Sequence, residues 1–219
     1  MRNDWCAMTS SNDEFWDKAA ASYDKFLFGS NALREAYRAI ESFLKSHLNP
    51  QMEVLELAAG PGTLSGTIAS CCKKLLATDN SQHMVAEAKK RDLPGNVSVT
   101  TADACNLALP NNSFDAVVIA NALHVIPGPQ QAAAEILRVL RPGGLLLAPT
   151  FTWGNEPAPG PAKSMRLLGY QTYSNWNQAE YVGFFEQHGF EVVSTSTVET
   201  PLLPLCLAQC KKPANTRCN

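Results

Sequence analysis

Apolar residues along the chain follow two spacings, one typical of buried strands and one typical of helices. Short apolar runs bounded by turn residues occur at 52–57, 73–79, 96–102, 114–120 and 145–151. Runs of this length and setting indicate buried strands. The segments between them carry apolar residues at helical spacing, so strands and helices alternate. The pattern predicts an α/β fold with a mostly parallel sheet and helices on both faces.

The last two expected strands, 190–198 and 202–210, depart from this alternation. Only Glu199-Thr200-Pro201 separates them, after a helix expected at about 176–188. Parallel neighbours need a long crossover, so these two strands must pair antiparallel. One of the seven expected strands therefore runs against the others.

Two helices are expected before the first strand. Residues 11–28 show helical spacing and end at Gly29, and a second helix begins after Ser30 and ends near Leu48. Both are expected to fold over the top of the sheet. We interpret the chain as one domain, 1–219, with N-terminal lid helices at 11–48, a core at 52–151, a loop region at 152–177, and a last helix with a hairpin at 178–211.

The composition favours a globular protein and argues against a nucleic-acid partner. The chain has 219 residues, 45% of them hydrophobic and 17% charged. Its net charge of −2 provides no overall basic surface for a nucleic acid. The N-terminus lacks the layout of a signal peptide, and no apolar run approaches the roughly 20 residues of a membrane helix. We therefore expect a cytoplasmic protein with no membrane span and no nucleic-acid partner.

Seven cysteines occur without regular spacing and without a CxxC pair. An odd, irregular set argues against a disulfide framework, and the sequence predicts no metal site. Cys206 and Cys210 would share one face of the last strand. We interpret the cysteines as buried, reduced thiols, with thiol or metal chemistry as the alternative.

The turn after the first strand, in "VLELAAGPGTLSG" (54–66), carries the first candidate chemistry. Open α/β sheets bind ligands at the carboxyl ends of their strands, and Gly60 and Gly62 let the backbone approach a ligand closely. A dinucleotide fingerprint needs a third glycine, but Ser65 stands there. Glu56 adds a carboxylate beside the turn. That charge suits a ligand with ammonium and sulfonium groups better than a pyrophosphate.

Further segments follow in a recognisable order: "ATDNSQHM", "TADACNLALP", "FDAVVIANALHVI" and "LRVLRPGGLLLAP". With "VLELAAGPGT" they resemble the class I S-adenosylmethionine-dependent methyltransferases over about residues 15–210. The small-molecule branch typified by the ubiquinone and menaquinone biosynthesis methyltransferases is the most similar. The resemblance implies a Rossmann-like, seven-stranded sheet with a reversed last strand, and S-adenosylmethionine as the cofactor.

The resemblance also implies roles for individual residues. Asp79 would bind the ribose hydroxyls, Asp103 would accept from the adenine amino group, and Ala104 would offer its backbone N–H. The implied cofactor-binding residues are Glu56, Ala58, Ala59, Gly60, Gly62, Asp79, Asn80, Met84, Asp103, Ala104, Ala120 and Asn121.

Ala58 departs from the family pattern, because it stands at the first glycine of the motif. Alanine disfavours positive φ. We therefore expect Ala58 to keep a negative φ, and we expect the turn to fail if this position needs a positive one.

Two side chains are candidates for the chemistry. His124, just past the fourth strand, is the best candidate for a general base. The alternative is a histidine that packs beneath the site. Tyr23 lies in "FWDKAAASYDKF", which resembles the family's lid helix, and would reach toward the cofactor or substrate; the alternative is a core aromatic. Methyl transfer depends mainly on alignment, so a base matters only for a hydroxyl or protonated-amine nucleophile.

Residues 151–177 are expected to select the methyl acceptor. Their aromatic side chains, including Trp153, Tyr170, Tyr173 and Trp176, suggest a pocket for a flat or apolar small molecule. The alternative is an ordinary loop with its own small core. The predicted activity is methyl transfer to O, N or C of a small molecule, with no prediction of oligomeric state. Alternatives are a non-catalytic cofactor-binding partner or regulator, a thiol-dependent arsenite methyltransferase, and a nicotinamide oxidoreductase, which the missing third glycine disfavours.

Overall fold

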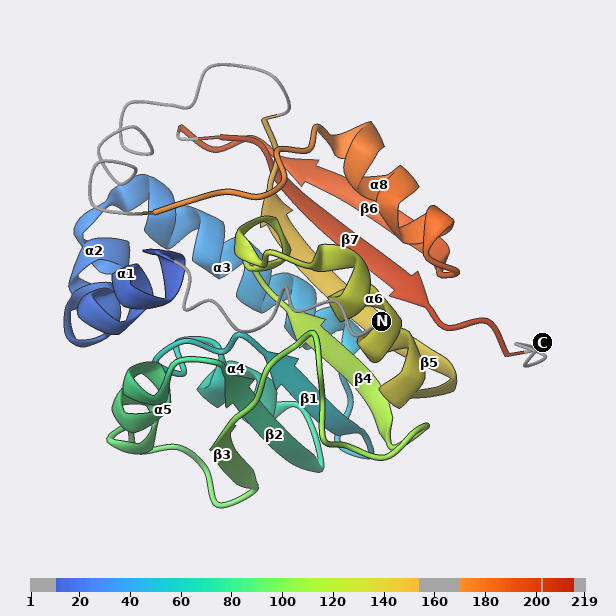
Figure 1. Ribbon diagram of the computed structural model, residues 1–219, viewed down its shortest axis with the longest axis horizontal. Coiled ribbons are helices and arrows are strands. Elements are labelled where there is room, and N and C mark those ends of the chain that lie inside the picture. The colour runs from blue at the N-terminus through green and yellow to red at the C-terminus, as the bar shows by residue number, and fades with distance from the viewer. Residues whose placement is uncertain (1–10, 154–169, 202, 215–219) are drawn as a thin grey trace.

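Seven strands form one sheet in the computed structural model, which describes residues 11–153, 170–201 and 203–214 (Figure 1). Their order across the sheet is β3-β2-β1-β4-β5-β7-β6. The strands are β1 (Glu53–Leu57), β2 (Lys74–Asp79), β3 (Val97–Thr101), β4 (Phe114–Ile119), β5 (Leu140–Phe151), β6 (Glu191–Val198) and β7 (Leu205–Lys211).

The pairing of the strands confirms the predicted sheet. β1 pairs in parallel with both β2 and β4, so the chain order reverses between β1 and β4. In open α/β sheets this switch point is where ligands bind, at the carboxyl ends of the strands. β7 pairs antiparallel with β5 and with β6, so the reversed strand lies between those two.

Helices pack on both faces of the sheet (Figure 1). Their starts follow local sequence signals: the Ser81 hydroxyl accepts from Met84 N, Pro129 takes a first helical position, and Asn177 with Glu180 forms a capping box. The helices are α1 (Ser11–Ala19), η2 (Ala20–Ser22), α2 (Tyr23–Gly29), α3 (Asn31–His47), α4 (Ser65–Ser70), α5 (Gln82–Lys89), η3 (Leu123–Val125), α6 (Pro129–Val139) and α8 (Gln178–Gln187).

Two elements differ from the sequence prediction. The helix expected at 11–28 contains a 3₁₀ turn, η2, between α1 and α2. β5 begins at Leu140 rather than at 145, because Leu140 already pairs with Phe114 and the Gly143 N–H donates to Lys212 O. The register shift between Phe114 and Ala116 takes up the extra residues.

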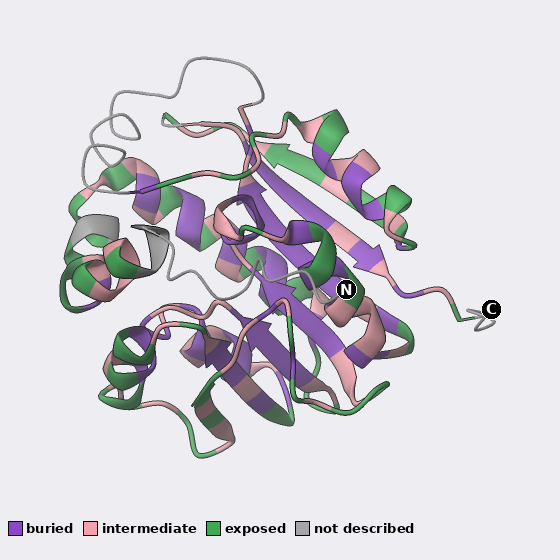
Figure 2. Ribbon diagram, viewed as in Figure 1, coloured by how far each residue is buried: buried purple, intermediate pink, exposed green. Residues whose placement is uncertain are grey.

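Buried side chains lie on both faces of the central strands, which form the buried middle of the molecule in Figure 2. Successive residues of a strand point to opposite faces, so each strand supplies two layers. Leu55 and Leu57 belong to the layer beneath α6 and α8, whereas Val54 belongs to the layer beneath α3 and α4. Parallel strands buried on both faces need the continuous apolar runs that the sequence shows.

Cys206 and Cys210 lie fully buried in the same layer, as the strand period predicts. Burial raises the pKa of the Cys206 thiol to about 11 and that of Cys210 to about 12. Both are free thiols, and the described residues hold no disulfide. Cys6 and Cys218 lie outside the described residues.

Candidate functional site

The turn after β1 places three small residues, at every second position, in the left-handed region. φ is +51° at Ala58, +57° at Gly60 and +79° at Gly62. The expectation of a negative φ at Ala58 is therefore wrong, and the turn forms nonetheless. The Ala59 N–H, which donates to Thr78 O at 2.9 Å, fixes the backbone next to Ala58. The penalty for alanine in this region is about 1–2 kcal/mol, which a packed fold can absorb.

We predict opposite stability effects of glycine at the two alanines of this turn. Ala58→Gly relieves the left-handed strain and should raise the free energy of unfolding by about 0.5–1 kcal/mol. Ala59→Gly is the matched control: its φ is negative, so glycine only adds unfolded-state entropy and should cost about 0.5–1 kcal/mol. Urea unfolding measures both, and equal effects would contradict the strain at Ala58.

Asp79, the last residue of β2, ties the turn to the start of α5. One carboxylate oxygen accepts from Gly60 N at 2.8 Å, and the other accepts from Ser81 N at 2.9 Å. Burial raises the pKa of this carboxyl. The carboxylate has about four acceptor sites, and Asn80 provides a third backbone hydrogen bond, so Asp79 keeps the capacity for about one further hydroxyl donor. A Cβ at Gly60 would meet no described atom within 4 Å, so this side of the turn is open. These residues fit the ribose end of S-adenosylmethionine.

Glu56 lies beneath the turn with 3% of its surface exposed. Its carboxyl accepts a 2.5 Å hydrogen bond from the Ser65 hydroxyl. Burial raises its pKa to about 8, against the lowering effect of Ser65. The group is therefore mostly neutral at pH 7.

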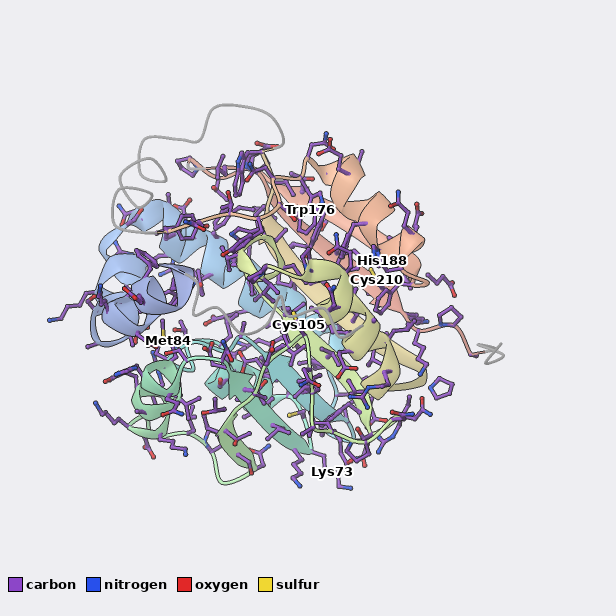
Figure 3. All side chains as sticks on the ribbon, in the orientation of Figure 1. Lys73, Met84, Cys105, Trp176, His188 and Cys210 are labelled. Atoms are coloured by element: carbon purple, nitrogen blue, oxygen red, sulfur yellow. The ribbon has the colours of Figure 1, made fainter. Side chains whose placement is uncertain are left out.

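The other predicted cofactor residues lie around the same strand ends. Asp103 follows β3 and accepts from Cys105 N at 2.8 Å, next to the buried Ala104. Met84 is buried in the first turn of α5 and faces the N-terminal helices (Figure 3). Asn80 is exposed after β2.

Ala120 and Asn121 directly follow β4, the strand beside β1. Asn121 adopts a φ of +50°, its N–H donates to Pro149 O at 2.8 Å, and its side-chain oxygen accepts from Phe151 N. Asparagine tolerates the left-handed region better than most residues. Two hydrogen bonds thus hold Asn121, just after β4, against the end of β5.

Tyr23 lies 3.3 Å, hydroxyl to hydroxyl, from the buried Tyr37 of α3. Tyr37 in turn hydrogen bonds to the side chain of Asn121. Burial is the main cause that raises the pKa of both tyrosines, so each is a neutral hydrogen-bonding group. We did not predict Tyr37 from the sequence; its hydroxyl on the otherwise apolar stripe of α3 is the signal that points to it.

His124 is buried in η3, with 6% of its surface exposed. Its Nε2 lies 3.1 Å from the Tyr170 hydroxyl and its Nδ1 lies 3.3 Å from the Thr150 hydroxyl. Burial lowers its pKa to about 4. Both ring nitrogens therefore have protein partners, which matches the packed alternative for this residue more closely than an exposed base.

α1 contacts the loop after β2 through Asp17. Its carboxylate accepts from the Ser81 hydroxyl and lies 3.2 Å from His83 Nδ1. The N-terminal helices therefore fold over the carboxyl ends of the strands, as predicted.

α2 contacts the glycine turn through Asp24. This carboxylate accepts from the Thr63 hydroxyl at 3.0 Å and pairs with Arg91, which also donates to Pro61 O. The sequence analysis missed Asp17 and Asp24. Their spacing of two helical turns, which puts both on one side of the lid, is the signal that was available.

We predict that Asp24→Ala loosens the lid. Asp24 is about two-fifths exposed, so the lost pair with Arg91 is worth at most about 1 kcal/mol. Hydrogen exchange across residues 14–29 should then speed up by about fivefold at most. Glu14→Ala is the control, because Glu14 forms only an exposed pair with Lys18 on the same helix. Equal protection from hydrogen exchange in the two variants would show that Asp24 does not hold the lid in place.

The aromatic residues of the 151–177 region divide into two groups, and residues 154–169 lie outside the described part. The ring centroid of Tyr170 lies 5.7 Å from that of Phe15 and 5.8 Å from that of Trp16, which joins it to α1. Trp153 packs against His124 at 5.6 Å. Trp176 instead points to α8 (Figure 3), where it packs on Tyr181 and Phe184, and Tyr173 is 40% exposed.

The described residues provide neither a metal site nor a membrane-spanning helix. Across 11–153, 170–201 and 203–214, no group of three or more His, Cys, Asp or Glu side chains could hold a metal ion. Within the same residues, each helix is too short or too polar to cross a membrane.

Part of the chain is similar in sequence to known methyltransferases. A family model described as a methyltransferase domain matches residues 55–148. Demethylmenaquinone methyltransferase of Renibacterium salmoninarum is 36% identical over 116 residues, covering 53% of this chain and 47% of that protein. Ubiquinone/menaquinone biosynthesis C-methyltransferase UbiE of Hydrogenovibrio crunogenus is 33% identical over 153 residues, covering 65% and 59%. The chain thus spans about half the length of these relatives.

Comparison with solved structures supports the fold. A DhpI–SAH complex structure superimposes with a TM-score of 0.69 at 22% identity, covering 94% of this chain and 97% of that one. The Rossmann-like sheet with its reversed strand is therefore shared with that structure. Residues 55–148 are thus similar to a methyltransferase domain, and the fold and the residues at the strand ends fit its cofactor, S-adenosylmethionine.

Proposed function

We propose that this protein is an enzyme that transfers a methyl group from S-adenosylmethionine to a small-molecule acceptor, at O, N or C. The observation that carries the proposal is the hydrogen bond from Gly60 N to the Asp79 carboxylate. It sets a carboxylate against an open glycine turn at the β1–β4 switch point.

Several residues of the cofactor site have a part in this proposal. Asp79 holds the ribose hydroxyls, Asp103 and Ala104 hold the adenine, and the turn from Ala58 to Gly62 faces the methionine part. Tyr23, held by Tyr37, closes the site from the lid. The cofactor supplies an activated methyl group when bound, so the chain mainly aligns the acceptor and excludes water.

The acceptor we propose is a flat or largely apolar molecule. Phe15 and Trp16 from the lid and Tyr170 from the opposite side form an aromatic cluster next to His124. Aromatic walls with a few polar groups are typical of small-molecule pockets. The relatives named as quinone-pathway methyltransferases act on ring-containing acceptors by name, which agrees with such a pocket. A cytoplasmic location is part of the same proposal.

A labelled-donor experiment tests the proposal. Purified protein incubated with tritiated S-adenosylmethionine and a small-molecule extract should label a low-molecular-weight product, and Asp79→Ala should label much less. Label confined to macromolecules would contradict the acceptor class. Tight binding of S-adenosylhomocysteine without any labelled product would favour the alternative, a non-catalytic cofactor-binding protein.

A further inference from the structure

His124 connects the core of the sheet to the acceptor side through two hydroxyl groups. Its Nδ1 lies 3.3 Å from the Thr150 hydroxyl on β5, and its Nε2 lies 3.1 Å from the Tyr170 hydroxyl. Thr150 is 1% exposed and His124 is 6% exposed. A buried polar network of this kind must satisfy each donor and acceptor internally, so the direction of each hydrogen bond is fixed.

Thr150 decides which nitrogen of His124 carries the proton. Within the described residues, His124 Nδ1 is the hydrogen-bond partner that the structure gives the Thr150 hydroxyl. A buried hydroxyl whose hydrogen has no acceptor costs about 1–3 kcal/mol. The Thr150 hydrogen therefore points to Nδ1, which then accepts. Because the buried ring is neutral at pH 7, with a pKa of about 4, its own proton is on Nε2.

The hydrogen bond between His124 and Tyr170 has the same direction of donation. The Nε2–H donates to the Tyr170 oxygen, so the phenolic hydrogen points away from His124, whichever atom receives it in the ligand-free protein. The Tyr170 ring lies against Phe15 and Trp16 of the lid, in the aromatic cluster that we propose for the acceptor. Each group in the network therefore donates a hydrogen bond to the next, from Thr150 to His124 and from His124 to Tyr170.

We infer that Thr150 is a positioning residue that holds His124 as the Nε2–H tautomer, so that the His124–Tyr170 pair presents a hydrogen-bond donor to an acceptor molecule bearing a carbonyl or anionic oxygen. The role toward the acceptor rests on the proposed methyl transfer; the tautomer itself does not. In this arrangement His124 does not remove a proton from the acceptor, because its accepting nitrogen faces Thr150.

Nitrogen-15 NMR of histidine-labelled protein tests the tautomer directly. The chain provides an internal contrast, since Nδ1 of His47 and of His188 lies within 2.8 Å of the carbonyl oxygens of Phe43 and Phe184. A carbonyl cannot donate, so these two rings must carry a proton on Nδ1. We expect His124, assigned with a His124→Gln variant, to show Nε2–H alone between pH 6 and pH 8.

Substitution of Thr150 completes the test. Thr150→Val removes the donor without changing the shape, and should shift His124 toward the Nδ1–H tautomer; Thr150→Ser should restore Nε2–H. Thr152→Val is the matched control, because Thr152 is equally buried at the end of β5 but bonds to Pro204 O. An Nδ1–H tautomer in the wild-type protein, or an unchanged tautomer in folded Thr150→Val, would overturn the inference.

The tritium assay separates this inference from the proposed function. Thr150→Val should lower the labelling rate at least fivefold, with unchanged affinity for S-adenosylhomocysteine, while Thr152→Val should keep the wild-type rate. A full rate in Thr150→Val, despite a changed tautomer, would refute the role toward the acceptor. No labelled product from the wild-type protein would refute the proposed function, and the tautomer result would still stand.

Discussion

Asp79→Ala is expected to weaken the binding of S-adenosylhomocysteine by at least tenfold. In the proposed function the carboxylate binds the ribose hydroxyls, and each lost charge-assisted hydrogen bond is worth about 1.5–3 kcal/mol. The substitution also removes the acceptors for Gly60 N and Ser81 N, so the turn loses its link to α5. A loss of 1.4 kcal/mol already corresponds to tenfold in the dissociation constant.

Isothermal titration calorimetry measures this effect, with circular dichroism as the check on folding. Asp92→Ala is the matched control, because Asp92 is an exposed acid in the loop after α5. It should bind the ligand as the wild-type protein does. An affinity for Asp79→Ala within twofold of the wild-type value would remove Asp79 from the cofactor site.

Glu56→Gln is expected to stabilise the ligand-free protein, and to do so more at pH 8 than at pH 5. The buried carboxyl has a pKa raised from 4.5 to about 8, so the folded state holds a proton that the unfolded state releases. Its favourable contribution is complete below pH 4.5 and is lost as the pH rises through about 8. The glutamine keeps an acceptor for the Ser65 hydroxyl and has no proton to lose.

The difference in unfolding free energy between Glu56→Gln and the wild-type protein should grow by roughly 3 kcal/mol from pH 5 to pH 8. Urea unfolding at the two pH values gives this quantity. Glu35→Gln, at an exposed position of α3, should show almost no growth. A constant difference for Glu56→Gln would show that Glu56 is ionised in the folded protein at both pH values.

The sequence predicted the sheet because its signals are local and repeated. Apolar runs marked the strands to within a few residues, and the short link after Val198 required an antiparallel pair. The start of β5 was missed because Leu140 follows α6 directly, where helical and strand spacing cannot be told apart. The 3₁₀ turn at Ala20–Ser22 has no marker in that alanine-rich segment either.

The candidate site was predicted less completely, for physical reasons. Acids at strand ends can be found from resemblance to family motifs, which is how Asp79 and Asp103 were predicted. Contacts between distant segments cannot be, so Tyr37 behind Tyr23 and Thr150 behind His124 were missed. The left-handed φ of Ala58 was mispredicted because residue preference was taken as a rule, whereas the bond from Ala59 N to Thr78 O outweighs it.

The position of β7 between β5 and β6 has a consequence for how the chain folds. Of the described strands, β6 is hydrogen bonded to β7 alone, although β6 comes first in the sequence. β6 therefore joins the sheet only with β7 or after it, although β7 is made later. A hairpin forms in about 1–10 μs, but its docking closes long loops and is slower. Until then, the edge of β5 is open to pairing with other chains.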